Sequence, residues 1–397
     1  MILTNCRLIK ELSSAEETGL YDVVLEDGRI KEIMTAGTGA GEGALDCGGK
    51  TLLPGLIDLH THVSGLRGIT ATDMGNPMKA LILCADFTQH YLDYGFTTIR
   101  DCGSFGRISN HIRDMYAHGL GVGPDIISSG RIITPTEEEL ADSLQEMYSE
   151  ADGPWEMKKA VRREMAEKAD FIKAMASGSA FDPHGIPTQS VITREELTAL
   201  VEAAAMKSTY VAAHAHSDSS IRLCVDCGVH TIEHATYISD ATIEALSKAP
   251  DCYLVPTLAA MYVSHPDGED GSFWIQRLGA MLDACAENIR KAYQAGMKLG
   301  FGTDSTVTMD QYEQGIEFRY RKELCGMKDV DILLQATKYS AEIAGIDDQV
   351  GTIVPGKKAD LILVDGKPEE DISCMYGKPM KVWKDGRLVR ENMQGDR

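Results

Sequence analysis

The chain has few basic residues for its acidic content, and it lacks any long apolar run. Of its 397 residues, 39 are Lys or Arg and 60 are Asp or Glu, which gives a formal net charge of −21. A surface of this sign repels nucleic-acid phosphates and anionic membranes, so we expect no nucleic-acid partner and no membrane partner. No stretch of about 18 uncharged apolar residues occurs, and we therefore predict no membrane-spanning helix.

The sequence also lacks the features of a secreted protein stabilised by disulfides. Its first residues show no basic start followed by an apolar run, so we predict no signal peptide. The 10 cysteines are scattered, and a chain of this length does not need disulfides, so we expect reduced thiols and a cytoplasmic location. Cys224 and Cys227 have CxxC spacing, but a structural zinc site needs a second such pair, so we expect these two to pack inward from a helix.

Both ends of the chain have a β pattern. Residues 21–34 alternate apolar and polar side chains around an Asp-Gly turn, which predicts a hairpin. Residues 359–366 and 380–389 predict further strands, the latter around a second Asp-Gly turn. We therefore expect one small β-sandwich domain built from residues 1–53 and 355–397.

The central segment, residues 54–354, alternates between strand-like and helix-like stretches. Eight short apolar stretches are each followed by a helical pattern such as residues 194–207, which predicts a parallel sheet and, with eight units, an α/β fold of the (β/α)8 TIM-type barrel class. A doubly wound open sheet is the alternative, but the first strand–helix junction lacks the glycine fingerprint of dinucleotide-binding folds. The predicted strands are residues 56–60, 96–101, 125–130, 170–176, 210–216, 231–235, 253–258 and 298–304.

Two segments, residues 134–156 and 261–274, interrupt this alternation. Both follow predicted strands, which places them at the C-terminal face of a barrel, where long loops often cover or contact substrate. Simple surface loops are an equal alternative. The glutamates at 137–139 would favour a cationic substrate, or they would follow a helix N-cap at Thr134 or Thr136. We prefer the N-cap interpretation.

Polar side chains gather at the C-terminal ends of the predicted strands. His60 and His62 are two residues apart, so both point to the same side of their strand. Lys173 lies within an apolar strand, where a charge is costly unless it is paired or modified. Imidazole and carboxylate groups that converge at one end of a barrel are typical of a divalent-metal site. The other members of this set are His214, His216, His234 and Asp304.

These motifs in combination resemble those of the amidohydrolase superfamily. The stretch PGLIDLHTH at 54–62 resembles the family's first-strand metal motif, and the resemblance covers nearly the whole chain. Further motifs narrow the likeness to imidazolonepropionase-like enzymes and, more closely, to the Xaa-Pro and Xaa-Arg dipeptidases and related N-acyl amino acid hydrolases. These motifs lie at 97–103, 170–179, 213–216, 231–235, 255–258 and 301–305.

The resemblance implies two divalent metal ions, for which we expect zinc, and a lysine carboxylated by CO₂. Lys173 takes the place of that bridging lysine. Its N-carboxylate would offer two oxygens and a negative charge, whereas an ammonium group would repel the ions. The implied ligands are His60, His62 and Asp304 for the more buried ion and His214 and His234 for the more exposed one, with Lys173 between them.

The resemblance also implies the reaction. A hydroxide held between the metals would attack the amide bond of a dipeptide or N-acyl amino acid, with Asp304 as general base and then general acid. His216, Tyr237 and His184 are the candidates for substrate contact. Relatives are commonly homo-oligomers, so the expected partners are a small amide substrate and further copies of the chain.

Other functions stay open to different degrees. Hydrolysis of a cyclic amide, such as an imidazolone, hydantoin or lactam, uses the same lysine and remains the first alternative. Ring deamination is disfavoured, because deaminating relatives have another residue in the place of Lys173. An inactive scaffold is disfavoured, because all six expected ligands are present.

Three features near the predicted site do not belong to the ligand set. Pro135 and the glutamates after it stand where many relatives have Gly-Gly-His, so this part of the substrate pocket is expected to differ. Arg100 and Asp101 are expected to form a structural ion pair with each other rather than to bind substrate. His230 precedes its strand at the far end and is expected to be structural.

Overall fold

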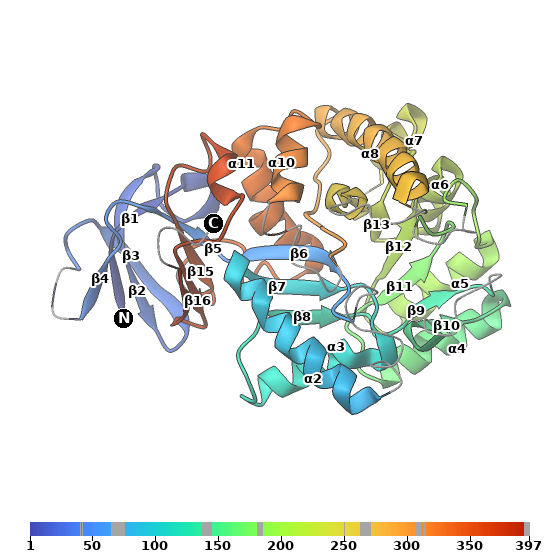
Figure 1. Ribbon diagram of the computed structural model, residues 1–397, viewed down its shortest axis with the longest axis horizontal. Coiled ribbons are helices and arrows are strands. Elements are labelled where there is room, and N and C mark those ends of the chain that lie inside the picture. Colours follow the sequence, from blue (N-terminus) through green and yellow to red (C-terminus); the bar gives the residue numbers. More distant parts are fainter. Residues whose placement is uncertain are drawn as a thin grey trace.

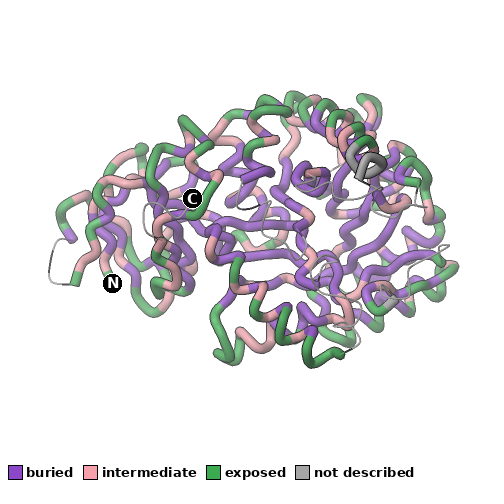
Figure 2. The backbone as a smooth tube through the Cα atoms, in the orientation of Figure 1, coloured by how far each residue is buried: buried purple, intermediate pink, exposed green. Residues whose placement is uncertain are grey.

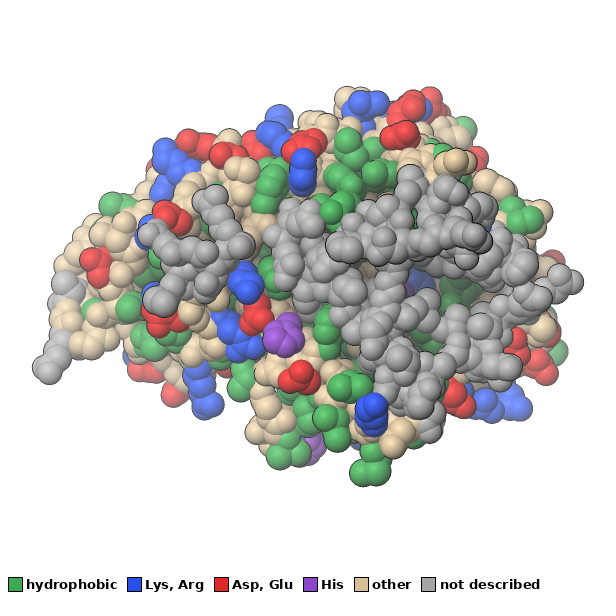
Figure 3. All heavy atoms as spheres, viewed as in Figure 1, with side chains coloured by type: hydrophobic (Ala, Val, Ile, Leu, Met, Phe, Trp, Pro, Cys, Tyr) green, Lys and Arg blue, Asp and Glu red, His purple; other side chains and the backbone are tan. Residues whose placement is uncertain are grey.

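The computed structural model contains a smaller part built mainly of strands and a larger part of strands and helices (Figure 1). It describes residues 1–39, 41, 43–64, 76–136, 145–180, 186–249, 251–262, 271–305, 312 and 315–392. Figure 3 shows acidic, basic and apolar side chains intermixed on one face of the molecule.

The smaller part is an eight-stranded sheet to which both ends of the chain contribute. The sheet order is β17-β16-β15-β5-β1-β2-β3, and β4 pairs with β1. Both Asp-Gly turns adopt the left-handed backbone that closes a tight hairpin, with φ of 50° and 77° in the first and 48° and 71° in the second. The strands are β1 (Ile2–Leu8), β2 (Gly19–Glu26), β3 (Arg29–Thr35), β4 (Ala44–Asp46), β5 (Thr51–Pro54), β15 (Leu361–Val364), β16 (Lys381–Lys384) and β17 (Arg387–Glu391).

The larger part contains two parallel sheets. One has the order β6-β7-β8 and the other β10-β9-β11-β12-β13-β14. Seven of the eight predicted strands are present as β6, β7, β8, β11, β12, β13 and β14. The bounds are β6 (Leu56–Thr61), β7 (Phe96–Asp101), β8 (Asp125–Ser128), β9 (Ile132–Thr134), β10 (Tyr148–Glu150), β11 (Ile172–Met175), β12 (Val211–Ala215), β13 (Thr231–His234) and β14 (Tyr253–Val255).

The prediction of a regular strand at 298–304 was wrong. This segment makes isolated parallel bridges instead, from Leu299 to Leu254 and from Ser305 to Thr61. A Cβ at Gly300 or Gly302 would lie 3.0 or 2.8 Å from Val255, so glycine allows the segment to approach β14 closely. The extended backbone then ends at Asp304, whose φ is 54°.

Helices cover the outside of the parallel strands. Figure 2 shows the strands of this part as largely buried, whereas the helices carry the exposed positions. The helix predicted at 194–207 is α5, which begins at a capping box between Thr193 and Glu196. The helices are α2 (Pro77–Thr88), α3 (Ile108–Ala117), α4 (Gly153–Ala166), α5 (Arg194–Ala205), α6 (Asp218–Cys227), α7 (Asp240–Leu246), α8 (Gly271–Gln294), α10 (Ile316–Glu323), α11 (Asp329–Leu334) and α12 (Ser340–Ala344).

The two parts are joined by a very short connection. Gly55 alone separates β5 of the smaller part from β6 of the larger one. A Cβ at this position would lie 2.0 Å from the Thr97 hydroxyl, so only glycine fits the approach to β7. The peptide N–H of Gly55 donates to the Asp360 carbonyl (2.8 Å), just before β15.

Several smaller predictions can be placed in the structure. None of the ten cysteines is in a disulfide; Cys224 packs inward from α6 as predicted, and Cys227 is half-buried. Within the described residues, no helix has both the length and the apolar character needed to cross a membrane. The glutamates at 137–139 and most of the segment 261–274 lie outside the described residues.

Candidate metal centre

The first group of candidate ligands lies where β6 meets the segment before Ser305. The Nε2 atoms of His60 and His62 are 3.6 and 3.4 Å from Oδ1 of Asp304. The three residues can offer ligand atoms that all lie within 4.8 Å of one another. The structure therefore brings together the three residues that the family resemblance assigned to the more buried ion.

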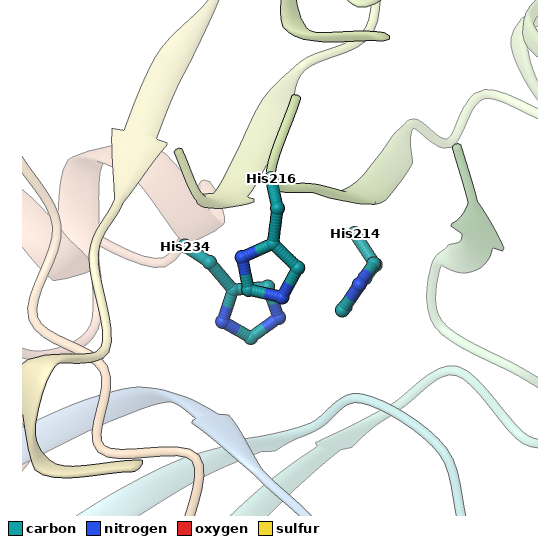
Figure 4. A group of neighbouring side chains, drawn as sticks. All are labelled: His214, His216 and His234. Atoms are coloured by element: carbon teal, nitrogen blue, oxygen red, sulfur yellow. The ribbon is translucent and has the colours of Figure 1, made fainter. Parts of the chain in front are cut away.

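The second group consists of His214 and His216 at the end of β12 and His234 at the end of β13. Figure 4 shows their rings gathered around a common space. The ring centroids of His214 lie 4.5 Å from those of His216 and His234, and those of His216 and His234 are 4.8 Å apart. His216, expected on the substrate side, is therefore as close to the group as the two expected ligands.

Lys173 on β11 contacts the first group, and its charge acts on both groups. Its Nζ lies 3.4 Å from Nε2 of His60, and the residue is 1% exposed. Burial, followed by the positive charge of Lys173, lowers the pKa of His62 to about 4 and that of His216 to about 3. One lysine thus acts electrostatically on a histidine of each group.

The protonation states suit metal binding. Burial is the main cause that lowers the pKa of His60, His214 and His234 well below the usual value, so these rings are neutral, which is the form that binds metals. Burial also raises the pKa of Asp304 to about 7, against the opposing charge of Lys173. A bound cation would favour the carboxylate form of Asp304, which is the form that binds metals.

The backbone is strained at the strand ends that carry the centre. His234, Ala235 and Asp304 have φ of 69°, 52° and 54°, a region that residues other than glycine seldom occupy. Such strain costs of order 1–3 kcal/mol per residue and is concentrated at functional sites. At β13 it breaks the strand alternation, so that His234 can join the same interior as Glu233.

The buried Asp58 fixes the backbone that carries His60 and Asp304. Its Oδ1 accepts the backbone N–H of His60 (2.9 Å) and of Thr303 (3.1 Å), the residues next to or within the ligand set. Its Oδ2 accepts the hydroxyls of Thr303 (2.6 Å) and Tyr312 (2.7 Å). The sequence prediction missed Asp58, although a buried aspartate two residues before His60 was visible in the motif.

Hydrogen bonds also orient the histidine rings. His62 Nδ1 donates to the Gly103 carbonyl (2.8 Å), which leaves its Nε2 as the free ligand atom. Nδ1 of His234 and of His216 are bonded to threonine hydroxyls at 2.6 and 2.8 Å. His214 differs, because its Nε2 is bonded to the Gly178 carbonyl (3.3 Å), so its Nδ1 is the free atom.

The predicted ion pair between Arg100 and Asp101 was wrong. Arg100 pairs with Glu233 at 2.7 Å, whereas Asp101 accepts the backbone N–H of Val63 at 2.8 Å. Adjacent residues of a strand point to opposite faces, which keeps the two side chains apart. His230 bonds to two backbone carbonyls away from the centre, which confirms its structural role.

The substrate side is only partly described. Tyr237 is half-buried, and its N–H donates to the His216 carbonyl (2.9 Å); His184 lies outside the described residues. Arg277 on α8 was not predicted, because no motif marks it. Its guanidinium donates to the Ser179 carbonyl (3.3 Å), and its charge contributes, after burial and Lys173, to the low pKa of His216.

Histidines near the ends of β6, β12 and β13, together with Lys173 on β11 and Asp304, are residue types that bind divalent metals in hydrolases. The model of the Amidohydrolase family matches residues 51–389, so the chain belongs to this family. It is a hydrolase that acts on carbon–nitrogen bonds.

Known proteins support the same subgroup. The chain is 28% identical over 373 residues to ochratoxinase of Aspergillus niger, with 85% of this chain and 75% of the relative covered. It is similar to the structure of a prolidase complexed with N-methylphosphonate-L-proline (28% identity, TM-score 0.85, 98% and 99% covered). A Xaa-Pro dipeptidase with bound methionine is similar to the same extent (27% identity, TM-score 0.85, 98% and 99% covered). The predicted resemblance is thereby confirmed.

Proposed function

We propose that the protein is a two-metal hydrolase that cleaves the amide bond of a dipeptide or an N-acyl amino acid. The observation that carries this proposal is the buried Lys173, which contacts His60 of the first group and whose charge acts on His216 of the second. In this proposal residues 54–354 form the barrel that bears the centre, and residues 1–53 and 355–397 form a β-sandwich domain.

Hydrogen bonds across the gaps between the parallel sheets support a barrel of eight positions. The segment around 299–305 bonds to both of its neighbours: Gly300 N–H donates to the Leu254 carbonyl (2.9 Å), and Leu59 N–H donates to the Phe301 carbonyl (2.8 Å). On the other side, Asp170 N–H donates to the Ser128 carbonyl (2.7 Å) between β8 and β11. We infer that these contacts join the sheets into one ring of (β/α)8 type.

The donor set fits two divalent ions, and the preference of imidazole and carboxylate for zinc makes that metal our assignment. His60, His62 and Asp304 would hold one ion, and His214 and His234 the other. When bound, such ions activate water and polarise the amide carbonyl. Lys173 would bridge them only as its N-carboxylate, formed with CO₂, because an ammonium group at this position would oppose cations.

The chain's own residues would supply the proton transfers and the substrate contacts. Asp304 would accept the proton of the attacking water and return it to the leaving nitrogen, because its Oδ1 lies beside Nε2 of both His60 and His62. We assign His216 to the substrate side together with Tyr237, because the backbone of Tyr237 is bonded to that of His216.

Metal content is the direct test of the proposed function. We expect close to two zinc ions per chain in zinc-loaded protein, measured by elemental analysis after removal of loosely bound metal. His234→Asn should lower the content by about one ion. His230→Gln, a half-buried histidine bonded to backbone carbonyls outside the centre, is the control and should keep both ions. Fewer than one ion per wild-type chain would contradict the two-metal assignment.

Arg277 should bind the carboxylate of the substrate. Its positive charge is one of the causes that lower the pKa of His216, and it acts in the same direction on the pKa of Tyr237. These are the two described residues that we place on the substrate side. A hydrogen bond to a charged group contributes about 1.5–3 kcal/mol, so Arg277→Met should lower kcat/KM for N-acyl amino acids roughly 10- to 100-fold, mainly through KM.

The matched control is Arg290→Met, which removes an exposed arginine from the same helix and should leave kcat/KM unchanged. The loss in Arg277→Met should disappear with substrates whose carboxylate is amidated. Turnover confined to cyclic amides without a carboxylate would contradict the assignment to dipeptides and N-acyl amino acids.

A further inference from the structure

A wholly buried ion pair lies next to His60, a member of the first ligand group. Arg100 on β7 and Glu233 on β13 are both 0% exposed, and the guanidinium NH2 lies 2.7 Å from Oε1 of Glu233. Oε2 of the same carboxylate lies 2.7 Å from Nδ1 of His60. The acidic member of the pair, Glu233, therefore contacts a candidate metal ligand, His60. Burying an ion pair costs desolvation free energy, so we expect this pair to serve a function.

The other two nitrogens of Arg100 also donate hydrogen bonds. Its Nε donates to the Leu59 carbonyl (2.5 Å), and its NH1 donates to the Thr231 hydroxyl (3.0 Å). The Thr231 hydroxyl in turn donates to Oε1 of Glu233 (2.6 Å). Bonds from three strands thus fix the carboxylate of Glu233 in one orientation, with Oε1 turned to Arg100 and Oε2 turned to His60.

Glu233 is itself poorly placed to bind a metal. His60, Cys102 and Glu233 form a third group with ligand atoms within 4.8 Å, but both carboxylate oxygens already accept hydrogen bonds. Burial raises the pKa of Cys102 to about 12, so the thiol keeps its proton, and its Sγ is directed at the Leu59 carbonyl (3.6 Å). Glu233 is better explained by what it does to His60.

The contact with Glu233 determines which nitrogen of His60 carries the proton. A metal-binding imidazole is neutral and has one N–H. A carboxylate can only accept, so the proton resides on Nδ1 and points at Oε2. The lone pair of Nε2 then faces Lys173 Nζ at 3.4 Å and Asp304 Oδ1 at 3.6 Å.

We propose that Glu233, held by Arg100, is the positioning residue that fixes the tautomer and the ring orientation of His60 so that Nε2 is presented to the metal. This rests on the proposed two-metal function and adds two residues that are not among the six implied ligands. Partners of this kind make a histidine ligand more basic and typically contribute 10- to 100-fold to metal affinity.

The sharpest variant is Glu233→Gln. Arg100 and Thr231 require an acceptor at the Oε1 position, so the amide oxygen turns toward them and the amide NH₂ faces His60. That NH₂ donates to Nδ1 and moves the ring proton to Nε2, the atom that should bind the metal. We expect zinc binding at one of the two sites to weaken roughly 10- to 100-fold, measured by competition with a chromophoric chelator.

Glu164→Gln is the matched control. Glu164 is also 0% exposed and is bonded to an arginine, Arg107, at 2.7 and 2.8 Å, but it does not contact a candidate ligand. Both variants should be less stable than the wild-type protein, because each weakens a buried ion pair. In Glu164→Gln, however, both zinc affinities should stay at the wild-type value. Wild-type affinities in Glu233→Gln, or an equal loss in both variants, would overturn the proposal.

A measurement on the wild-type protein keeps the proposal testable if Glu233→Gln does not fold. ¹⁵N spectra of histidine-labelled protein, assigned with His60→Asn, should show His60 protonated at Nδ1. Protonation at Nε2 would overturn the inference. If wild-type protein binds no zinc, the proposed function fails as well, whereas two bound ions with an Nε2-protonated His60 would contradict the role of Glu233 and the use of Nε2 as ligand, but not the two-metal function.

Discussion

Replacement of Lys173 by alanine should abolish turnover and reduce bound zinc below two ions per chain. Lys173 is 1% exposed, acts on histidines of both groups, and is the residue whose N-carboxylate would bridge the ions. Its loss leaves the two histidine groups without a shared anionic ligand. We expect kcat/KM to fall at least about 1,000-fold, which corresponds to about 4 kcal/mol of barrier.

Two further measurements separate this chemical role from a loss of folding. Lys384→Ala removes another buried lysine, one paired with Asp360 at 2.9 Å within the terminal sheet, and should lower stability while activity and zinc content remain. Small carboxylic acids, which can occupy the space left in Lys173→Ala, should restore part of the activity. Near wild-type turnover in Lys173→Ala with a single bound ion would contradict the bridging role.

The second large effect is expected for Asp304→Asn. The amide keeps the shape of the side chain but can no longer exchange a proton, so the transfer from water to the leaving nitrogen is lost. General acid–base catalysis contributes about 10²- to 10⁴-fold, and we expect kcat to fall by that factor while zinc remains bound at the His214–His234 site. Steady-state kinetics beside elemental analysis would measure both quantities.

Asp101→Asn provides the comparison for that variant. Asp101 is also a buried strand-end aspartate, and burial raises its pKa to about 6, but it bonds to backbone N–H groups rather than to the ligand set. It should cost stability and leave the proton-transfer step intact. An Asp304→Asn enzyme that keeps most of its kcat would exclude Asp304 as the proton carrier.

The sequence was most informative where strand geometry is regular. His60 and His62, and likewise His214 and His216, are two residues apart, and that spacing alone places each pair on one side of its strand. The hairpins at the chain ends were equally predictable, because an Asp-Gly pair between alternating residues has few other conformations.

Prediction failed where a contact depends on a neighbouring strand or on unusual backbone geometry. Strand alternation already argues against Asp101 as the partner of Arg100, but the actual partner, Glu233, depends on which strand faces β7 across the interior. Strict alternation would also set His234 opposite to Glu233, and only the left-handed backbone at His234 removes that conflict. Arg277 depends on the path of α8, which no motif reveals.

The single glycine between β5 and β6 has a consequence for how the protein is made. β5 finds its partner β15 far along the chain, beyond all the strands of the larger part, as the pairing of Leu53 with Ile362 shows. Contacts between such distant parts of a chain form late in folding. Because Gly55 is the only spacer, the strand that carries His60 is anchored at its base only once β15 has been made, so a chain interrupted before β15 would lack this anchor beside the candidate metal centre.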